Sequence, residues 1–150
     1  MSSFIDDFNI DRLGFDWAKP VVAEGSTCDC FVVQIDGKMH FMKKLKDEFY
    51  ENITYRNLLK KEFQVGKSIC HPNIVKYDSI NDSDDACYIL MENIVGKTLN
   101  EFIDLKPDYF QSRANFDKFF LQLLSALNCL HQNHVVYSDL KPQNIMITQV

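Results

Sequence analysis

Hydrophobic and polar positions alternate along the first half of the chain in a way that predicts β-strands. Two segments, CFVVQI (Cys30–Ile35) and KMHFMKKL (Lys38–Leu45), flank an Asp-Gly dipeptide. That dipeptide supplies the positive φ angles of a two-residue hairpin turn, so the two segments are predicted to form a hairpin. Two further short strands are predicted at Ile74–Ile80 and Ala86–Glu92, with an acidic turn between them.

Helical periodicity replaces this alternation at three places. Apolar residues among Lys, Glu and Gln predict an amphipathic helix over Asn52–Ile69, carrying Leu58, Leu59, Phe63 and Val65. A short helix is predicted at Thr98–Leu105. The strongest pattern covers Asn115–His134, where large side chains recur at i, i+3, i+4 and i+7. We expect this stripe to face a core; it consists of Phe116, Phe119, Phe120, Leu123, Leu124, Leu127 and Leu130.

The change from strands to helices near Gly96 predicts two lobes in an α+β protein. Residues 1–16 mix Phe and Asp without a firm period and are expected to form an N-terminal extension. Residues 17–95 are expected to form a β-rich lobe with one helix, and residues 96–150 a helical part. With 150 residues, of which 46% are hydrophobic, the chain can bury a real core.

Charge and cysteine content narrow the class of protein. A formal net charge of -5 argues against a protein that chiefly binds nucleic acid. The five cysteines are odd in number and contain no CxxC, which argues against a disulfide framework or a zinc site. The first residues are acidic, unlike a signal peptide, and no apolar run approaches the roughly 18 residues needed to span a bilayer. We therefore expect a soluble cytoplasmic protein without a membrane or nucleic-acid partner.

The stretch VVYSDLKPQN, Val135–Asn144, places an acid, a base and an amide close together after the long helix. A carboxylate accepts a proton from a hydroxyl substrate, an ammonium offsets phosphate charge, and an amide oxygen ligates a hard cation such as magnesium. These groups together suit phosphoryl transfer, in which catalysis is mostly positioning and charge neutralisation. The same residue types are common in solvated turns, so this stretch alone leaves both interpretations open.

Other segments, taken in order, resemble the protein kinase family. DLKPQN is similar to its catalytic loop, Ala23–Cys30 lies where the family has a glycine-rich loop, and His40–Lys43 lies where the third strand carries a phosphate-binding lysine. HPNIVKY and YILMEN are also similar, and the likeness covers residues 17–150. It implies a kinase-like fold: a β-rich N-lobe with one regulatory helix, then the start of a helical, truncated C-lobe. It also implies a serine/threonine protein kinase that uses ATP and Mg²⁺ to phosphorylate a protein substrate.

The resemblance implies a role for each matching residue. Asp139 would be the catalytic base, Lys141 would steady the transferring phosphoryl group, and Asn144 would hold a magnesium ion. Lys43 would hold the phosphates of the nucleotide and would itself be kept in place by Glu62. The neighbouring lysine of the KKLK run and an exposed helix carboxylate are the plainer alternatives for these last two positions.

The nucleotide pocket is implied at further positions. Met91 resembles the residue at the back of the adenine pocket, whereas Glu92 and Ile94 would offer backbone groups to adenine. The complete set of expected nucleotide-binding positions is Ala23, Gly25, Cys28, Cys30, Phe41, Lys43, Glu62, Met91, Glu92, Ile94 and Met146.

The sequence also departs from the family. Of the three loop glycines only Gly25 remains, because Ala23 and Cys28 replace the others, and a Cβ restricts a loop that must approach phosphate. The thiol of Cys28, expected at the loop tip, should be partly exposed. Phe41 replaces a small alanine and either stacks on the base or fills its pocket. Ser138 replaces an arginine, so we expect activity that does not depend on phosphorylation of the activation loop.

Three functions remain open at this point. The first is an active serine/threonine protein kinase of which this chain is the N-terminal part. The second is a non-catalytic kinase-like module that binds a partner or a nucleotide, favoured by the altered loop and Phe41. The third is a small-molecule phosphotransferase of kinase-like fold, against which DLKPQN argues. The 150 residues lack the Asp-Phe-Gly segment, so we expect an inactive fragment. With much of the C-lobe absent, this fragment should be either marginally stable or held by self-association through the exposed helix stripe.

Overall fold

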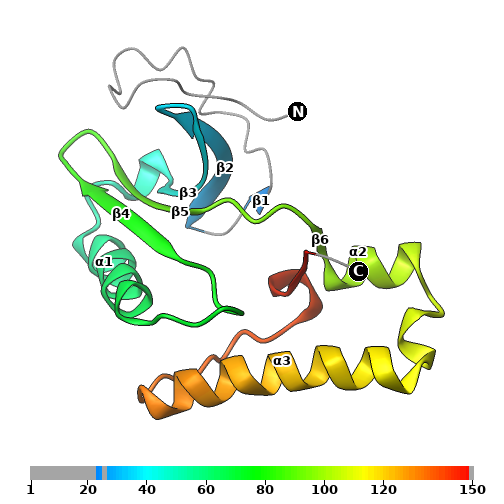
Figure 1. Ribbon diagram of the computed structural model, residues 1–150. Helices are drawn as coiled ribbons and strands as arrows, with labels where there is room; N and C mark the ends of the chain where they lie inside the picture. Colours follow the sequence, from blue (N-terminus) through cyan, green and yellow to red (C-terminus); the bar gives the residue numbers. More distant parts are fainter. Residues whose placement is uncertain (1–22, 25–26, 149–150) are drawn as a thin grey trace. The chain divides into compact units, whose positions relative to one another are not determined.

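The structure is a computed structural model that describes residues 23–24 and 27–148 (Figure 1). The chain divides into two compact units. The first unit comprises Met1–Ser68 and Lys76–Asn93, and the second comprises Ile69–Val75 and Ile94–Val150. The boundary predicted near Gly96 stays a prediction; sequence reasoning did not anticipate that Ile69–Val75 groups with the second unit.

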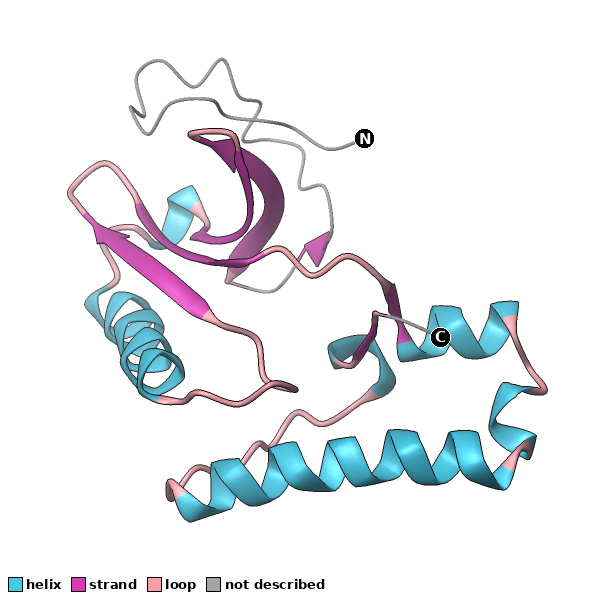
Figure 2. Ribbon diagram, in the orientation of Figure 1, coloured by secondary structure: helices cyan, strands magenta, loops and turns pink. Residues whose placement is uncertain are grey.

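The first unit is built on a five-stranded antiparallel sheet with the strand order β1-β2-β3-β5-β4 (Figure 2). Its strands are β1 (Ala23–Glu24), β2 (Cys28–Ile35), β3 (Lys38–Leu45), β4 (Tyr77–Asp82) and β5 (Cys87–Glu92). The core cluster on this sheet consists of Phe31, Val33, Ile35, Met42, Ala86, Tyr88 and Leu90.

The predicted hairpin between β2 and β3 is confirmed. Ile35 pairs with Lys38, so two residues form the turn, and both have positive φ: 50° at Asp36 and 77° at Gly37. These angles belong to the turn that matches the twist of the flanking strands. The strand pairing extends to Cys28, two residues before the predicted start of the first strand.

The predicted amphipathic helix is confirmed as α1 (Ile53–Ser68), which lies beside β4 in Figure 1. It begins after Asn52, whose side chain accepts hydrogen bonds from the backbone N–H groups of Thr54 (3.1 Å) and Tyr55 (3.3 Å). This is a helix cap, which satisfies donors that the first turn leaves free. Of its two adjacent leucines, Leu59 is buried and Leu58 is exposed.

The predicted position of the strand before β5 was wrong by several residues. It was expected at Ile74–Ile80, whereas β4 runs over Tyr77–Asp82 because Asp82 pairs with Cys87 on β5. The connecting turn is therefore shorter than the acidic run suggested. Ser83 closes it by donating its backbone N–H to the carbonyl oxygen of Ala86 at 3.0 Å.

The second unit contains two helices, a two-stranded sheet and three-residue 3-10 turns. Its elements are β6 (Lys97–Thr98), α2 (Leu99–Leu105), η3 (Tyr109–Gln111), α3 (Arg113–Gln132), η4 (Pro142–Asn144) and β7 (Met146–Ile147). The predicted short helix is confirmed as α2, which starts with a reciprocal capping pair between Thr98 and Glu101. Within the described ranges, no helix has both the length and the apolar character needed to cross a membrane.

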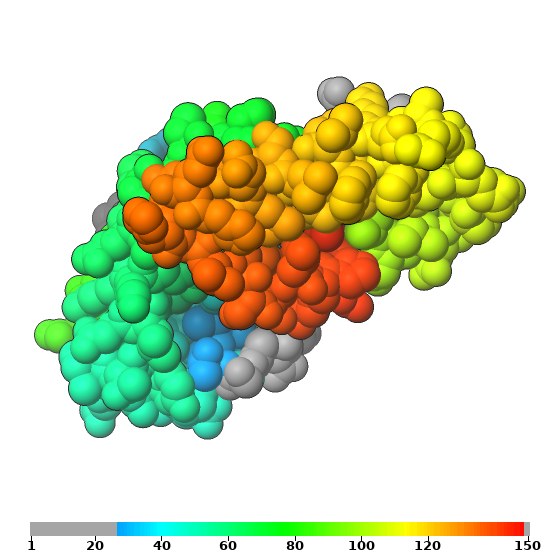
Figure 3. Space-filling view, turned by 90° about the horizontal axis from the view of Figure 1, so that it is seen from below, coloured from blue at the N-terminus to red at the C-terminus, as the bar shows by residue number. Residues whose placement is uncertain are grey.

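The long helix is present, but its apolar stripe is not buried as expected. The helix begins two residues earlier than predicted, at Arg113, because Ser112 caps it by accepting from the backbone N–H of Asn115. Phe116, Phe120 and Leu124 are each more than 40% exposed. Figure 3 shows the atoms of α3 (yellow to orange) at the surface, beside those of residues 135–148 (orange to red).

Candidate active site

Lys43 on β3 and Glu62 on α1 form an ion pair within the first unit. The Lys43 Nζ donates to Glu62 Oε2 at 2.8 Å, and each side chain is about one third exposed (31% and 33%). The helix cap and the packing of α1 beside the sheet place Glu62 over this part of β3. The pairing expected from sequence is thus present in the structure, whereas its role in holding a nucleotide stays a prediction.

Burial and charge act on Lys43 in opposite directions. Desolvation is the largest influence and lowers the pKa of the ammonium, but the charge of Glu62 and its hydrogen bond raise it. The net result is a pKa above the ordinary value for lysine. Lys43 therefore stays a cation, the state needed to hold phosphate groups.

The neighbouring Lys44 has a different carboxylate partner from Lys43. Successive residues of a strand face opposite sides of the sheet. The side chain of Lys44 is buried, donates to Asp47 at 2.9 Å and lies 4.8 Å from the centre of the Tyr50 ring. Lys43 is therefore the lysine that meets the carboxylate of α1.

Cys30 and Phe41 share the sheet face of Lys43. Cys30 is directly opposite Lys43 on β2, and Phe41 pairs with both Val32 and Met91. Burial is the main cause that raises the pKa of Cys30 to about 11. Phe41 is half-buried on β3 and Met91 is buried on β5.

The predicted exposure of Cys28 was wrong. Its side chain is buried, with 7% exposed, because β2 extends to Cys28 and pairs it with Leu45. Burial also raises the pKa of the thiol above its ordinary value. Of the other expected loop positions, Ala23 pairs with Cys30 through β1, and Gly25 lies outside the described residues.

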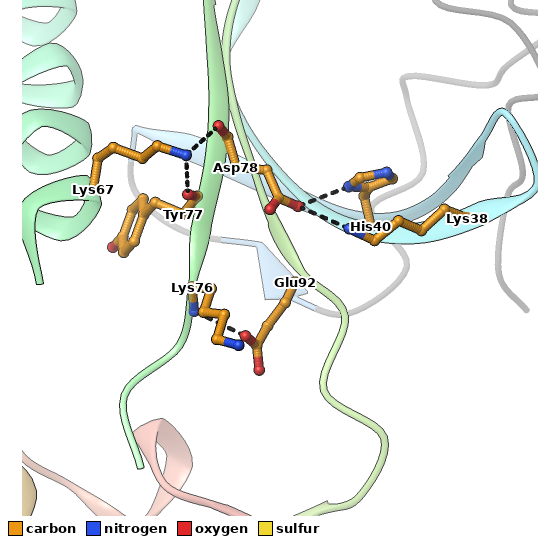
Figure 4. A network of polar contacts seen from close by, with 7 residues as sticks. All are labelled: Lys38, His40, Lys67, Lys76, Tyr77, Asp78 and Glu92. Carbon is orange, nitrogen blue, oxygen red and sulfur yellow. Dashed lines mark hydrogen bonds and ion pairs between the residues drawn. The ribbon is translucent and has the colours of Figure 1, made fainter. Parts of the chain in front are cut away.

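Glu92 ends β5 and is tied to Lys76 by two contacts. Its backbone N–H donates to the Lys76 carbonyl oxygen at 2.9 Å, and its carboxylate accepts from the Lys76 backbone N–H at 3.1 Å. Figure 4 shows the second of these contacts. The expected contact of the Glu92 backbone with adenine stays a prediction. Ile94, the other expected backbone contact, is half-buried in the second unit.

Asp139, Lys141 and Asn144 come together in the second unit. The Asn144 Nδ2 donates to the backbone oxygen of Asp139 at 2.8 Å and to its Oδ2 at 3.0 Å. The Lys141 Nζ lies 3.6 Å from the other carboxylate oxygen, Oδ1. The acid, base and amide predicted from the DLKPQN stretch therefore form one cluster rather than three separate solvated side chains.

The backbone on either side of this cluster is held by hydrogen bonds. The 3-10 turn η4 starts at Pro142, and its Asn144 N–H donates to the carbonyl oxygen of Lys141 at 2.9 Å. After the turn, β7 pairs with β6, which places Met146 opposite Thr98. Gly96 next to β6 permits this close approach, because a Cβ there would lie 2.3 Å from the Ile147 carbonyl oxygen.

The donor atoms of the cluster fit a hard cation. Carboxylate and amide oxygens are the ligands that magnesium prefers. The Nδ2 of Asn144 donates its hydrogen bonds to Asp139. The Oδ1 of Asn144 is therefore the side-chain atom that can ligate such an ion. Among the described residues, no three or more His, Cys, Asp or Glu side chains gather closely enough to hold a metal by themselves.

Sequence reasoning missed a residue that touches Glu62. The Tyr77 hydroxyl donates to Glu62 Oε1 at 3.0 Å. Tyr77 stands in the HPNIVKY segment, and no local pattern in that segment indicates a contact with a residue 15 positions earlier. The contact arises only when β4 packs beside α1.

Comparisons with known proteins agree on one family. A family model for the protein kinase domain matches residues 20–150. The chain is 34% identical over 109 residues to a probable serine/threonine-protein kinase of Clostridium perfringens, covering 72% of this chain and 16% of that protein. It is also 34% identical over 107 residues to the serine/threonine-protein kinase PrkC of Bacillus subtilis, covering 71% of this chain and 16% of that protein.

A solved structure, the apo form of PpkA-294, has a similar fold. The TM-score is 0.72 at 16% sequence identity, and the match covers 87% of this chain and 53% of that one. At this identity the likeness concerns the fold alone. The chain spans only a small part, 16%, of the curated relatives named above.

Proposed function

Because the chain belongs to the protein kinase family, we propose that it supplies nucleotide-anchoring and catalytic-loop residues of a serine/threonine protein kinase. The predicted α+β, kinase-like fold is confirmed by the likeness to a solved structure. The cluster of Asp139, Lys141 and Asn144 carries the proposal, because it joins in one turn a proton acceptor, a cation and an oxygen ligand. The names of the bacterial relatives support the serine/threonine class.

The proposed reaction moves the γ-phosphoryl group of ATP to a hydroxyl of a protein substrate. Asp139 accepts the proton of that hydroxyl. Lys141, which lies near the Asp139 oxygen that Asn144 does not contact, offsets the charge of the transferred phosphoryl group. Among the described residues the Asp139 side chain is 69% exposed, and the Lys141 Nζ lies 3.6 Å from its Oδ1.

ATP and Mg²⁺ are the cofactors that we propose. Lys43 holds phosphate groups of the nucleotide, and Glu62 fixes the direction of its ammonium. Asn144 holds the magnesium ion, which neutralises charge on the phosphate oxygens when bound. In this proposal Met146, exposed on β7, lies beneath the adenine base, and Glu92 and Ile94 offer backbone groups to it.

The test is Asp139→Asn in the full-length protein, with transfer of labelled phosphate from ATP to protein as the measurement. The amide keeps the size of the side chain but cannot accept the proton, so we expect a loss of about 10²- to 10⁴-fold. Asp104→Asn is the matched control, because Asp104 is exposed on α2. Transfer at the parent rate by the Asp139 variant would contradict the proposal.

A non-catalytic kinase-like module is the second candidate, and Phe41 is the observation that favours it. Its large side chain stands among Val32 and Met91, where the family has a small residue. Binding of a fluorescent ATP analogue to the parent and to Phe41→Ala separates the two candidates. Binding only by the Phe41→Ala variant would favour the non-catalytic module.

We further propose a cytoplasmic location, with a protein substrate as the partner. Self-association through the apolar stripe of α3 stays a prediction for the 150-residue chain, supported by the exposure of Phe116, Phe120 and Leu124. Sedimentation of the 150 residues at several concentrations, with Phe120→Glu as the comparison, tests it. A concentration-independent monomer would contradict it.

A further inference from the structure

Glu62 is held through both of its carboxylate oxygens. Oε2 accepts from Lys43 at 2.8 Å, and Oε1 accepts from the Tyr77 hydroxyl at 3.0 Å. The two donors come from β3 and β4, which are separated in the sheet by β5. A carboxylate with two donors in different directions is restricted in its rotation, whereas one with a single donor can turn about that bond.

Gly66 makes room for the Tyr77 ring. A Cβ at Gly66 would lie 2.3 Å from Cδ2 and 2.4 Å from Cε2 of that ring, distances that real Cβ atoms do not show. Gly66 is four residues after Glu62, so both lie on the same face of α1. A glycine inside a helix costs about 1 kcal/mol relative to alanine. The close approach of the Tyr77 ring explains why a glycine stands here in spite of that cost.

The backbone of Tyr77 is also tied to α1. Near the end of the helix, the Lys67 Nζ donates to the carbonyl oxygens of Tyr77 at 3.2 Å and Asp78 at 3.1 Å, as Figure 4 shows. The pairing of β4 with β5 shifts by one residue at this point, between Tyr77 and Ser79. The ring of Tyr77 also meets Phe63 edge to face, with 6.4 Å between centroids. The ring is therefore fixed on several sides.

We propose that Tyr77 is a positioning residue: its hydroxyl, brought over α1 by the missing side chain at Gly66, holds the Glu62 carboxylate toward Lys43. This inference rests on the proposed function for its effect on catalysis, because Lys43 is the group proposed to hold phosphate. The hydroxyl acts through Glu62 and needs no contact with the nucleotide.

The first variant is Tyr77→Phe in the full-length protein, which removes the hydroxyl and keeps the ring. Tyr55→Phe is the matched control, because Tyr55 is also half-buried in the first unit and packs against Phe49. Loss of one hydrogen bond to a charged group should lower kcat/KM by about tenfold. The unfolding midpoint should change little, since the ring still fills its place beside Gly66.

The decisive readout is the acylation rate of Lys43 by an amine-directed reagent, measured by mass spectrometry without nucleotide. The groups that face Lys43 are Glu62 on α1 and the thiols of Cys28 and Cys30 on β2. Tyr77→Phe leaves the two thiols unchanged but frees the carboxylate, so the ammonium should lose its proton more easily and react several-fold faster. A Lys43 rate equal to that of the parent would overturn the proposal.

Gly66→Ala provides a second route to the same result. The added methyl group must push the ring away, so the Lys43 acylation rate should rise as in Tyr77→Phe. The double variant should react no faster than Tyr77→Phe alone, because the hydroxyl is already gone. Additive increases would show that the two residues act independently and would overturn the proposal.

The two readouts keep this inference separate from the proposed function. If the parent transfers no phosphate but Lys43 acylation responds to Tyr77→Phe, the positioning role stands and the proposed function fails. If the parent transfers phosphate but neither kcat/KM nor Lys43 acylation responds, the positioning role fails and the proposed function stands.

Discussion

The lysine–carboxylate pairs of the two units differ in spacing and in exposure. In the first unit, Lys43 and Glu62 are 2.8 Å apart and about one third exposed, whereas in the second unit Lys141 and Asp139 are 3.6 Å apart and 50% and 69% exposed. In the short, partly desolvated pair, Glu62 fixes the direction of the Lys43 ammonium, as is needed to anchor a phosphate group. Among the described residues, the ion pair of the first unit is thus closer and less exposed than that of the second. The closer spacing accompanies the proposed task of anchoring, and the wider spacing the proposed task of proton acceptance.

The large apolar side chains are also more buried in the first unit than in the second. Phe31 and Val33 of the first unit are fully buried in the sheet core, while Phe116 and Phe120 of the second unit stack on one another at the surface of α3, 5.6 Å apart. The first unit therefore has a core of its own within the described residues. The stability of the second unit in the 150-residue chain should depend less on the large side chains of its longest helix.

The largest expected effect would test this difference in the 150-residue chain. Phe31→Ala should cost about 3–5 kcal/mol, because it removes a fully buried aromatic side chain and leaves a cavity. Phe120→Ala should cost less than about half of that, since much of its ring is already in water. Hydrogen exchange of β3 and α3 amides measures each unit separately. Equal costs would contradict the comparison.

The next prediction separates the proposed role of Lys43 in anchoring the nucleotide from its contribution to the free energy of unfolding. Lys43→Met should reduce phosphoryl transfer by the full-length protein by about 10²- to 10³-fold, as loss of a charge-stabilising donor does. The free energy of unfolding should change by less than about 1 kcal/mol, because the pair is partly exposed and screened by solvent. Lys61→Met, which removes an exposed lysine of α1, is the control. A variant that transfers phosphate normally would show that another group anchors the nucleotide.

A third effect concerns the thiols. With the pKa of Cys30 raised to about 11, its thiolate fraction at pH 8 is roughly 10⁻³, so alkylation should be about 100-fold slower than for an ordinary exposed cysteine. Cys70 is exposed and should react first. Peptide mass spectrometry after a timed treatment with iodoacetamide measures both rates. Equal rates at Cys30 and Cys70 would contradict the burial of β2.

The smallest effect concerns the ion pairs that tie α1 to β4. A hydrogen bond from Lys60, assisted by Arg56, lowers the pKa of Asp82 below its ordinary 3.8. A carboxyl whose folded pKa is lowered stabilises the protein above its unfolded pKa, and this stabilisation is lost as pH falls through the folded pKa. Asp82→Asn should therefore lower the free energy of unfolding at pH 7 by less than about 1 kcal/mol. As pH falls below 3.8 and through the lowered folded pKa of Asp82, the denaturation midpoints of parent and variant should converge; a constant gap would contradict this explanation.

Local chemistry explains what the sequence predicted well. The turn at Asp36 and Gly37 was predictable because Asp-Gly sets its own backbone angles, and the start of α1 lies within one residue of the expected position because Asn52 caps it. The cluster of Asp139 and Asn144 lies within six consecutive residues, so its assembly needs only a turn. Family resemblance added the pairing of Lys43 with Glu62, which periodicity alone does not give.

Longer-range pairing explains what the sequence did not predict. The limits of β4 depend on its register with β5, and the burial of Cys28 depends on its pairing with Leu45. Neither register is encoded in a short window of residues. The contact of Tyr77 with Glu62 likewise needs the sheet and α1 to be packed, since the space for the ring is an absent side chain at Gly66.

The pairing of β6 with β7 has a consequence for how the protein folds. Lys97 and Ile147 pair although about fifty residues separate them along the chain. Closing such a long loop carries an entropy cost that must be met before the contact contributes stability. During synthesis, the turn that holds Asp139 and Asn144 is therefore not fixed by the β6–β7 pair until β7 has left the ribosome. The groups proposed for catalysis are therefore expected to acquire their native order only after β6 and β7 have paired.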